Sequence, residues 1–381
     1  MIVSQNDINI KNFFALLQAG LWEKETKLYK SEANDLFEIL KVAEDQSVVG
    51  LVAAGIEHLY DEKVPKEIVL QFVGEALKLE ERNKAMDSFI ASLIDNLRRN
   101  GVYTLLLKGQ GIAQCYERPL WRSSGDIDLF LSENNYKSAL EYLKPYAKCI
   151  DEENVYSRHI GMNIGQWEVE LHGFLRCGLW KKIDAVLDDI QSDIFFGGKV
   201  RSWMNNNCQV FLPKVDEDVV YVFAHILQHY FKGGVGLRQI CDWCRLIWTF
   251  KDSIDVKLLE RRVRGMSAMS EWKTFAAFAI DYLGFPIEAM PLYSDRKCWH
   301  KKAKHVLPFV LETGNFGHKR DNSYLHNKPS FKRKVYSLRR ATSDCIHHFF
   351  VFPFDSLRVW FGIVKKGISS FGEGTFRLSN R

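Results

Sequence analysis

Several features that would place the chain in a special class of protein are scarce in its sequence. Its 381 residues contain only nine prolines and no repeat or low-complexity tract, which excludes a collagen-like or wholly disordered chain. The eight cysteines are spread thinly, unlike the dense framework of a small secreted domain, so we expect reduced thiols. No window of about 18 residues is free of charge, which argues against a membrane-spanning helix. The first residues lack a basic stretch followed by an apolar core, so we expect a cytoplasmic protein.

A strong charge of one sign is also absent from the chain as a whole. Lys and Arg number 52 against 47 Asp and Glu, a net charge of +5. The excess is local, because residues 319–381 hold 13 basic and 4 acidic residues and the rest of the chain has a net charge of −4. We expect this segment to pack on the body through its aromatic side chains. Contact with a phosphate-bearing acceptor or a membrane surface is the alternative.

The spacing of hydrophobic residues changes along the chain and predicts an α+β protein. Helical periods at both ends enclose a stretch that alternates short strand-like runs with short helices, and Gly165-Gln166 there predicts a hairpin. A small mixed-sheet domain is therefore flanked by N-terminal and C-terminal helical regions. The expected parts are an N-terminal helical region at 1–100, the mixed domain at 101–214, a C-terminal helical region at 215–318 and the basic aromatic segment at 319–381.

Two carboxylates are the first candidates for chemistry. Asp126 and Asp128 begin the apolar run that ends at Leu131, and alternation along a strand places both side chains on one face. Their mutual repulsion is costly unless a cation relieves it, and Mg²⁺ is a hard ion that prefers oxygen ligands. A third carboxylate is available in a later strand, where Glu168, Glu170 and His172 share one face, and either glutamate can complete the cluster.

Basic residues and glycines precede the acids. Lys108 and Gly109 stand where a strand, expected over 102–107, gives way to a helix, expected over 109–116; the start of a helix favours a bound phosphate. Arg122 lies in the following loop, which ends at Gly125, and a guanidinium there can form paired hydrogen bonds with phosphate oxygens.

The C-terminal helical region holds two further candidates. His225 and His229 are four residues apart on a helix, but Ile226 stands where a zinc protease has glutamate, so we exclude that class. These histidines are structural or contact a bound ligand. Arg238 either pairs along its helix with Asp242 or reaches that ligand.

Other histidines and cysteines have simpler interpretations. His172, beside the third acid, either supports a metal site or merely packs. Cys241 and Cys244 have redox spacing but lie in a helical pattern, so we expect them in the core. The adjacent pair His347-His348 is expected at the surface.

The run LLLKG at 105–109, the run GDIDLFL at 125–131 and the later VELHG at 169–173 together resemble the polymerase β-like nucleotidyltransferase superfamily. More narrowly, the chain is similar to an uncharacterised bacterial nucleotidyltransferase family. The resemblance covers 100–245 best, with a further similar stretch at 236–242. It implies a nucleotidyltransferase catalytic domain in the middle of the chain.

The resemblance also implies roles for individual residues. Asp126, Asp128 and Glu170 would hold two Mg²⁺ or Mn²⁺ ions, with Glu170 able to take the acceptor proton. Lys108 and Gly109 would lie against the triphosphate. Gln110 stands where the superfamily usually has glycine or serine. The full set of expected nucleotide-binding residues is Lys108, Gly109, Gln110, Arg122, Gly125 and Arg238.

The expected reaction transfers a nucleoside monophosphate from a nucleoside triphosphate to a hydroxyl of an unknown small-molecule, sugar or protein acceptor. Pyrophosphate would leave as the acceptor attacks the α-phosphorus in line. Two alternatives stay open: an inactive nucleotide-binding regulatory module, and a transferase that modifies nucleic acid. A nucleic-acid partner is not favoured, because the catalytic region lacks a broad basic stripe with interleaved aromatic residues.

Overall fold

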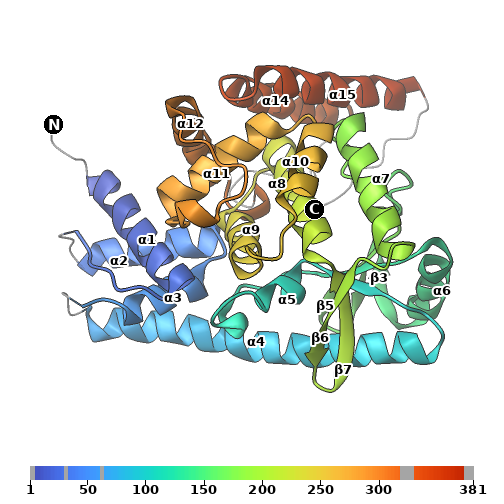
Figure 1. The fold of residues 1–381 in the computed structure, drawn as a ribbon, viewed down its shortest axis with the longest axis horizontal. Helices are drawn as coiled ribbons and strands as arrows, with labels where there is room; N and C mark the ends of the chain where they lie inside the picture. Colours follow the sequence, from blue (N-terminus) through green and yellow to red (C-terminus); the bar gives the residue numbers. More distant parts are fainter. Residues whose placement is uncertain (1–4, 30–32, 61–63, 318–329, 373–381) are drawn as a thin grey trace.

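A mixed β-sheet lies on the right-hand side of the molecule in the view of Figure 1. The structure, a computed structural model, describes residues 5–29, 33–60, 64–317 and 330–372. Within them the strands run in the order β3-β4-β5-β2-β1-β7-β6; β2 pairs with β5 and β1 with β7 in parallel, and the other pairs are antiparallel. The strands are β1 Leu105–Leu107, β2 Ile127–Phe130, β3 Ala147–Ile150, β4 His159–Ile164, β5 Trp167–His172, β6 Val200–Asn205 and β7 Cys208–Pro213.

Helical regions precede and follow this sheet, so the predicted α+β fold is confirmed. The first region comprises α1 Gln5–Trp22, α2 Ala33–Asp45, α3 Val49–Glu57 and α4 Lys66–Arg99. The sheet domain adds α5 Gly109–Ala113, α6 Glu133–Leu143, α7 Lys181–Phe195 and the 3₁₀ turns Pro119–Trp121 and Lys144–Tyr146. The last region comprises α8 Val215–Lys232, α9 Leu237–Thr249, α10 Val256–Gly265, α11 Met269–Leu283, α12 Lys297–Thr313, α14 Ser330–Phe349 and α15 Pro353–Gly372, with 3₁₀ turns at Ile287–Ala289 and Asn315–Gly317. The four-part division of the chain stays a prediction.

The two faces of the sheet have different partners. Along β2 and β5, alternate side chains pack into one core with α4 and α6, which accounts for the alternation of apolar and polar residues along β5. The members from these strands are Ile127, Leu129, Val169 and Leu171. The residues between them, Asp128, Glu170 and His172 among them, therefore point to the opposite face. That face is where α8 and α9 lie, and it carries the polar site described below.

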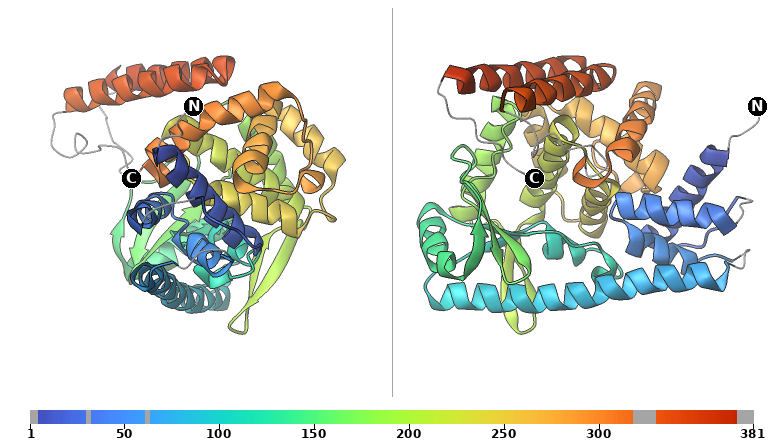
Figure 2. Two further views of the ribbon diagram at one scale, coloured as in Figure 1. Left: turned by 90° about the vertical axis from the view of Figure 1, so that its left-hand side faces the viewer. Right: turned by 180° about the vertical axis from the view of Figure 1, so that it is seen from behind.

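The predicted hairpin is present, and a long helix precedes the sheet domain. Gly165 adopts a left-handed backbone with φ of +63°, and the turn joins β4 to β5 in a regular antiparallel ladder. Helix α4 is continuous over 34 residues and is followed by Gly101 with φ of +75°. It runs along one side of the molecule, beneath both the N-terminal helices and the sheet (Figures 1 and 2).

The C-terminal hairpin of α14 and α15 lies on the side of the molecule opposite α4 (Figure 2). The surface location expected for both adjacent histidines is wrong for one of them. His347 is exposed, whereas His348 is buried against the rings of Tyr230 and Phe309, because the hairpin turns its aromatic face toward α8 and α12. Parts of the basic segment, 319–329 and 373–381, lie outside the described residues. No helix in the described part of the chain is long and apolar enough to cross a bilayer.

Candidate active site

Three carboxylates converge at the polar face of the sheet. Asp128 of β2 lies directly beside Glu170 of β5 in parallel register, and both side chains are 2% exposed. Asp126 precedes β2 by one residue. One carboxylate oxygen from each of the three lies within 4.8 Å of the others. Of the two glutamates that could complete the cluster, Glu170 is the one that reaches it. Glu168 is exposed and lies opposite Asn163 in the β4–β5 ladder.

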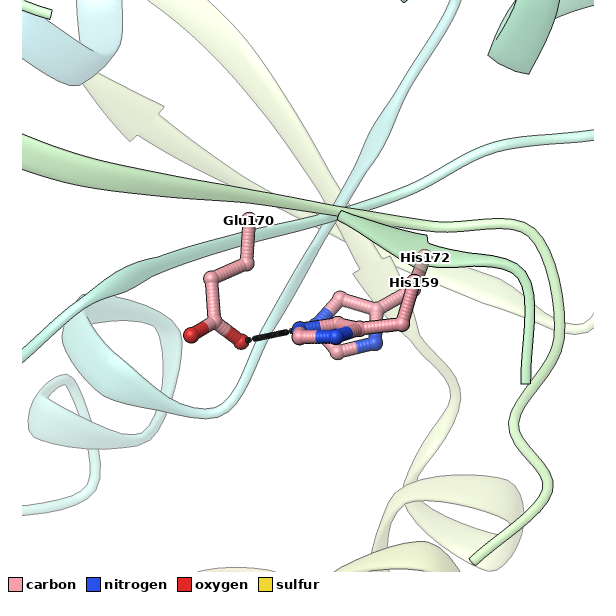
Figure 3. A group of neighbouring side chains, drawn as sticks. All are labelled: His159, Glu170 and His172. Atoms are coloured by element: carbon pink, nitrogen blue, oxygen red, sulfur yellow. Dashed lines mark hydrogen bonds and ion pairs between the residues drawn. The ribbon is translucent and has the colours of Figure 1, made fainter. Parts of the chain in front are cut away.

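Two imidazoles border the acids, and Figure 3 shows both beside Glu170. His159 on β4 approaches Glu170, with 2.7 Å between its Nε2 atom and Oε2. His172 on β5 lies with its Nε2 atom 2.7 Å from Oδ1 of Asp128 and 3.4 Å from Oε2 of Glu170. The centres of the two rings lie 4.6 Å apart. His172 therefore touches the acidic cluster directly rather than merely packing nearby.

Lys108 balances part of the negative charge. Its Nζ atom lies 3.2 Å from Oδ1 of Asp128. Burial alone would raise the pKa of Asp128, but Lys108 and His172 more than offset it, so this pKa lies well below its usual value. Burial likewise opposes the charge on Lys108, but Asp128, Tyr221 and Asp126 together outweigh it, which leaves the pKa of Lys108 above its usual value. Asp128 is thus ionised at neutral pH, as a cation ligand must be.

The backbone at the end of β1 is bent so that Lys108 can reach this position. Lys108 has φ of +48° and Gly109 has φ of +44°, and a left-handed conformation is uncommon for a residue with a side chain. The helix expected over 109–116 ends at Ala113. The chain then turns so that the hydroxyl of Tyr116 donates to Asp242 of α9. Helix α5 is short because its continuation is held by α9.

A small pocket of about 30 Å³ lies on one side of the acids. Its lining includes five of the six residues predicted to bind nucleotide: Lys108, Gly109, Arg122, Gly125 and Arg238. Gln110 is the exception. Its side chain is buried against α4, where its amide donates to Asp87 at 2.7 Å, so the departure from the usual glycine or serine serves packing between α5 and α4.

The two arginines of this pocket have different partners. Arg122 forms a paired hydrogen bond with both oxygens of Asp242, at 2.7 and 2.6 Å, and both side chains are almost fully buried. Asp242, four residues after Arg238 on the same helix, is thus a partner of Arg122. Arg238 donates to the backbone oxygen of Ser123 at 3.2 Å, beside Gly125. Burial, together with the nearby charge of Arg122, lowers the pKa of Arg238.

A larger pocket of about 230 Å³ opens on the other side of the acids. Its wall from α8 carries Tyr221, His225, Gln228 and His229, and its opposite wall includes His159, Glu170 and His172. Nε2 of His229 lies 3.0 Å from Nε2 of His225, and burial lowers the pKa of His229 to about 3. Both histidines are therefore neutral lining groups at neutral pH, accessible to a ligand.

Sequence reasoning missed His159. The signal was present, because counting outward from the Gly165-Gln166 turn places position 159 directly opposite 172, as observed. The expectation for Cys241 and Cys244 is confirmed, since both are completely buried in α9, and all eight cysteines are free thiols.

Comparison with known proteins agrees with the resemblance that the sequence motifs indicate. The model of a family described as "Uncharacterised nucleotidyltransferase" matches residues 32–279, about two thirds of the chain. This match covers α4, the whole sheet and the helices that wall both pockets. Neither the curated proteins nor the solved structures contain a significant match.

Proposed function

The chain belongs to this uncharacterised nucleotidyltransferase family, and from that premise we propose that it transfers a nucleoside monophosphate from a nucleoside triphosphate to a hydroxyl acceptor, with divalent ions held by Asp126, Asp128 and Glu170. The observation that carries the proposal is the convergence of these three carboxylates within 4.8 Å between two pockets. The donor set fits the ion, because Mg²⁺ prefers hard oxygen ligands. When bound, such ions neutralise phosphate charge and orient the reacting oxygens.

The small pocket suits the phosphates of the nucleotide. Lys108, Arg122 and Arg238 place three positive side chains on its lining, and Gly125 leaves space beside the Arg238 guanidinium. Arg122 is fixed by Asp242, so we expect it to contribute mainly a fixed electrostatic field. Arg238 also lines this pocket, and a guanidinium can form paired hydrogen bonds with phosphate oxygens. Gly109 has no side chain, so a phosphate can approach its backbone closely.

The larger pocket is the proposed acceptor site. It meets the small pocket at Asp126 and Lys108, so an acceptor hydroxyl there can face a nucleotide phosphate across the acids. Glu170 borders this pocket and is the carboxylate placed to take the acceptor proton. The remaining lining is mostly neutral and polar, which suits a hydroxylated small molecule, sugar or side chain better than a polyanion.

A pyrophosphate-release assay tests the proposal. Purified protein is supplied with each nucleoside triphosphate, Mg²⁺ or Mn²⁺ and a panel of hydroxyl acceptors, and modified acceptors are identified by the added mass of one nucleoside monophosphate. Glu170→Gln and Asp128→Asn should each lower turnover at least about 100-fold, because a carboxylate ligand is replaced by a neutral amide.

Glu168→Gln is the matched control, because Glu168 lies on the same strand two residues away and is exposed. Its turnover should equal that of the unmodified protein. Undiminished turnover in Glu170→Gln and Asp128→Asn would contradict the assignment. Metal-dependent nucleotide binding without pyrophosphate release for any acceptor would favour a regulatory module, and salt-sensitive retention on RNA or DNA would favour a nucleic-acid substrate.

A further inference from the structure

We propose that His159, Glu170 and His172 form a second type of cation site, one for a first-row transition ion such as Mn²⁺ or Co²⁺ rather than Mg²⁺. This inference deepens the proposed function and rests on it in one respect, because Glu170 is shared with the acidic cluster. The group is one of two in the described residues whose ligand atoms all lie within 4.8 Å of one another.

The register of two neighbouring strands brings the group together. His159 of β4 and His172 of β5 are directly opposed in an antiparallel ladder, which places their side chains on the same face of the sheet. Glu170 lies two residues before His172 on β5 and so shares that face. The arrangement is therefore fixed by backbone hydrogen bonds within a hairpin, not by a mobile loop.

The side chains are directed at one another, as Figure 3 shows. The Nε2 atoms of His159 and His172 lie 2.7 and 3.4 Å from the same atom, Oε2 of Glu170. In the ion-free protein, hydrogen atoms lie between these nitrogens and the carboxylate oxygens. A cation that takes their place would be held by two nitrogens and one oxygen.

The ligand chemistry selects the ion. Imidazole nitrogen suits transition ions such as Mn²⁺, Co²⁺ and Zn²⁺, whereas Mg²⁺ prefers oxygen and retains its waters. Lys108 pairs with Asp128, an acid that the histidine site does not need. The Asp126–Asp128 pair and the histidine group would therefore differ in the ions that they prefer.

The site is accessible from the larger pocket, whose lining includes all three residues. The side chains of His159 and His172 are 23% and 13% exposed, whereas Glu170 is 2% exposed. Three protein ligands leave positions for an oxygen of a molecule bound in that pocket. The acceptor hydroxyl of the proposed reaction would thus lie beside the histidine group, and the triphosphate beside the aspartates.

Binding of Co²⁺, Mn²⁺ and Mg²⁺ to the full chain without nucleotide tests the proposal. We expect a Co²⁺ absorption spectrum typical of imidazole ligation, and at least about tenfold weaker Co²⁺ and Mn²⁺ binding in His159→Asn. Mg²⁺ binding should change less than about twofold. His305→Asn, an exposed histidine on α12, is the control and should leave all three affinities unchanged.

A measurement on the unmodified protein covers the case in which His159→Asn does not fold. Electron spin echo spectroscopy of bound Mn²⁺ should detect coupling to imidazole nitrogen, and its absence would overturn the inference. Unchanged Co²⁺ affinity and spectrum in a folded His159→Asn variant would also overturn it. If pyrophosphate is released with Mg²⁺ but no nitrogen ligation is found, the histidine site is contradicted and the proposed function is not. If nitrogen ligation is found but no acceptor supports nucleotide turnover, the proposed function is contradicted and the histidine site is not.

Discussion

Asp242 lines the small pocket and links Arg122 of that pocket to Tyr116. It accepts a paired hydrogen bond from Arg122 and another, at 2.8 Å, from the hydroxyl of Tyr116. The cluster is almost fully buried, where an ion pair is stable only if its geometry is close to ideal. Both oxygens of the carboxylate are used, so the charge of Arg122 is compensated without help from a ligand.

Asp242→Asn should lower the free energy of unfolding by about 3–5 kcal/mol, because it leaves the Arg122 guanidinium buried without its counter-charge. Urea denaturation measures this. The control is Glu260→Gln, which breaks the exposed pair between Glu260 and Arg264 and should cost less than about 0.5 kcal/mol. An equal loss of stability in the two variants would show that the buried ion pair contributes no more than the exposed pair does.

The residues of the site differ in how far sequence could reveal them. Asp126, Asp128 and Glu170 were predictable because strand alternation fixes their faces and local motifs mark them. The partner of Arg122 was not, because Asp242 lies 120 residues away and the contact depends on how α9 packs against the loop. The helical spacing of Arg238 and Asp242 suggested a local pair, and it gave no sign that a distant arginine also binds Asp242.

At the scale of elements, helix α4 holds the loop that carries Arg122. The buried Asn83 amide donates to the backbone oxygens of Leu120 and Arg122, at 2.7 and 2.8 Å. Farther along the helix, Asp87 accepts from Gln110 of α5. One helix thus supports both segments that border the small pocket, which explains why it continues without a break beneath the N-terminal helices and the sheet.

Asn83→Ala should remove both contacts and leave two buried carbonyl groups without this donor, which costs about 1–3 kcal/mol. We also expect a higher KM for nucleotide with a smaller change in kcat, because the loop is a positioning element. Thermal melting and steady-state kinetics measure the two effects. Lys84→Ala, one residue away on the exposed face of α4, should change neither; a KM identical to that of unmodified protein in Asn83→Ala would contradict this role for α4.

The elements themselves were largely predictable, and their ends were not. The apolar runs and the Gly165-Gln166 turn identified β1, β2, β4 and β5, since periodicity reports burial directly. Helix α5 was expected to reach residue 116 and ends at Ala113. Its end depends on tertiary contacts of Tyr116 with α9, which local sequence does not encode.

At the scale of the whole molecule, the two faces of the sheet differ: one packs into an apolar core and the other carries the candidate site. The face toward α4 and α6 is filled by apolar side chains, and the other presents acids and histidines to two pockets walled by α8 and α9. The family match ends at residue 279, within α11. Beyond it, the C-terminal hairpin packs His348 and Phe352 against aromatic residues of α8, away from both pockets.

The most direct test of the central claim is a crystal structure with Mn²⁺ and a non-hydrolysable nucleoside triphosphate, in which anomalous scattering locates the ions. The account predicts an ion ligated by Asp126 and Asp128, with the phosphates extending toward Gly109 and Arg238. Nucleotide and ions bound elsewhere, with no ion within about 3 Å of these carboxylates, would contradict it.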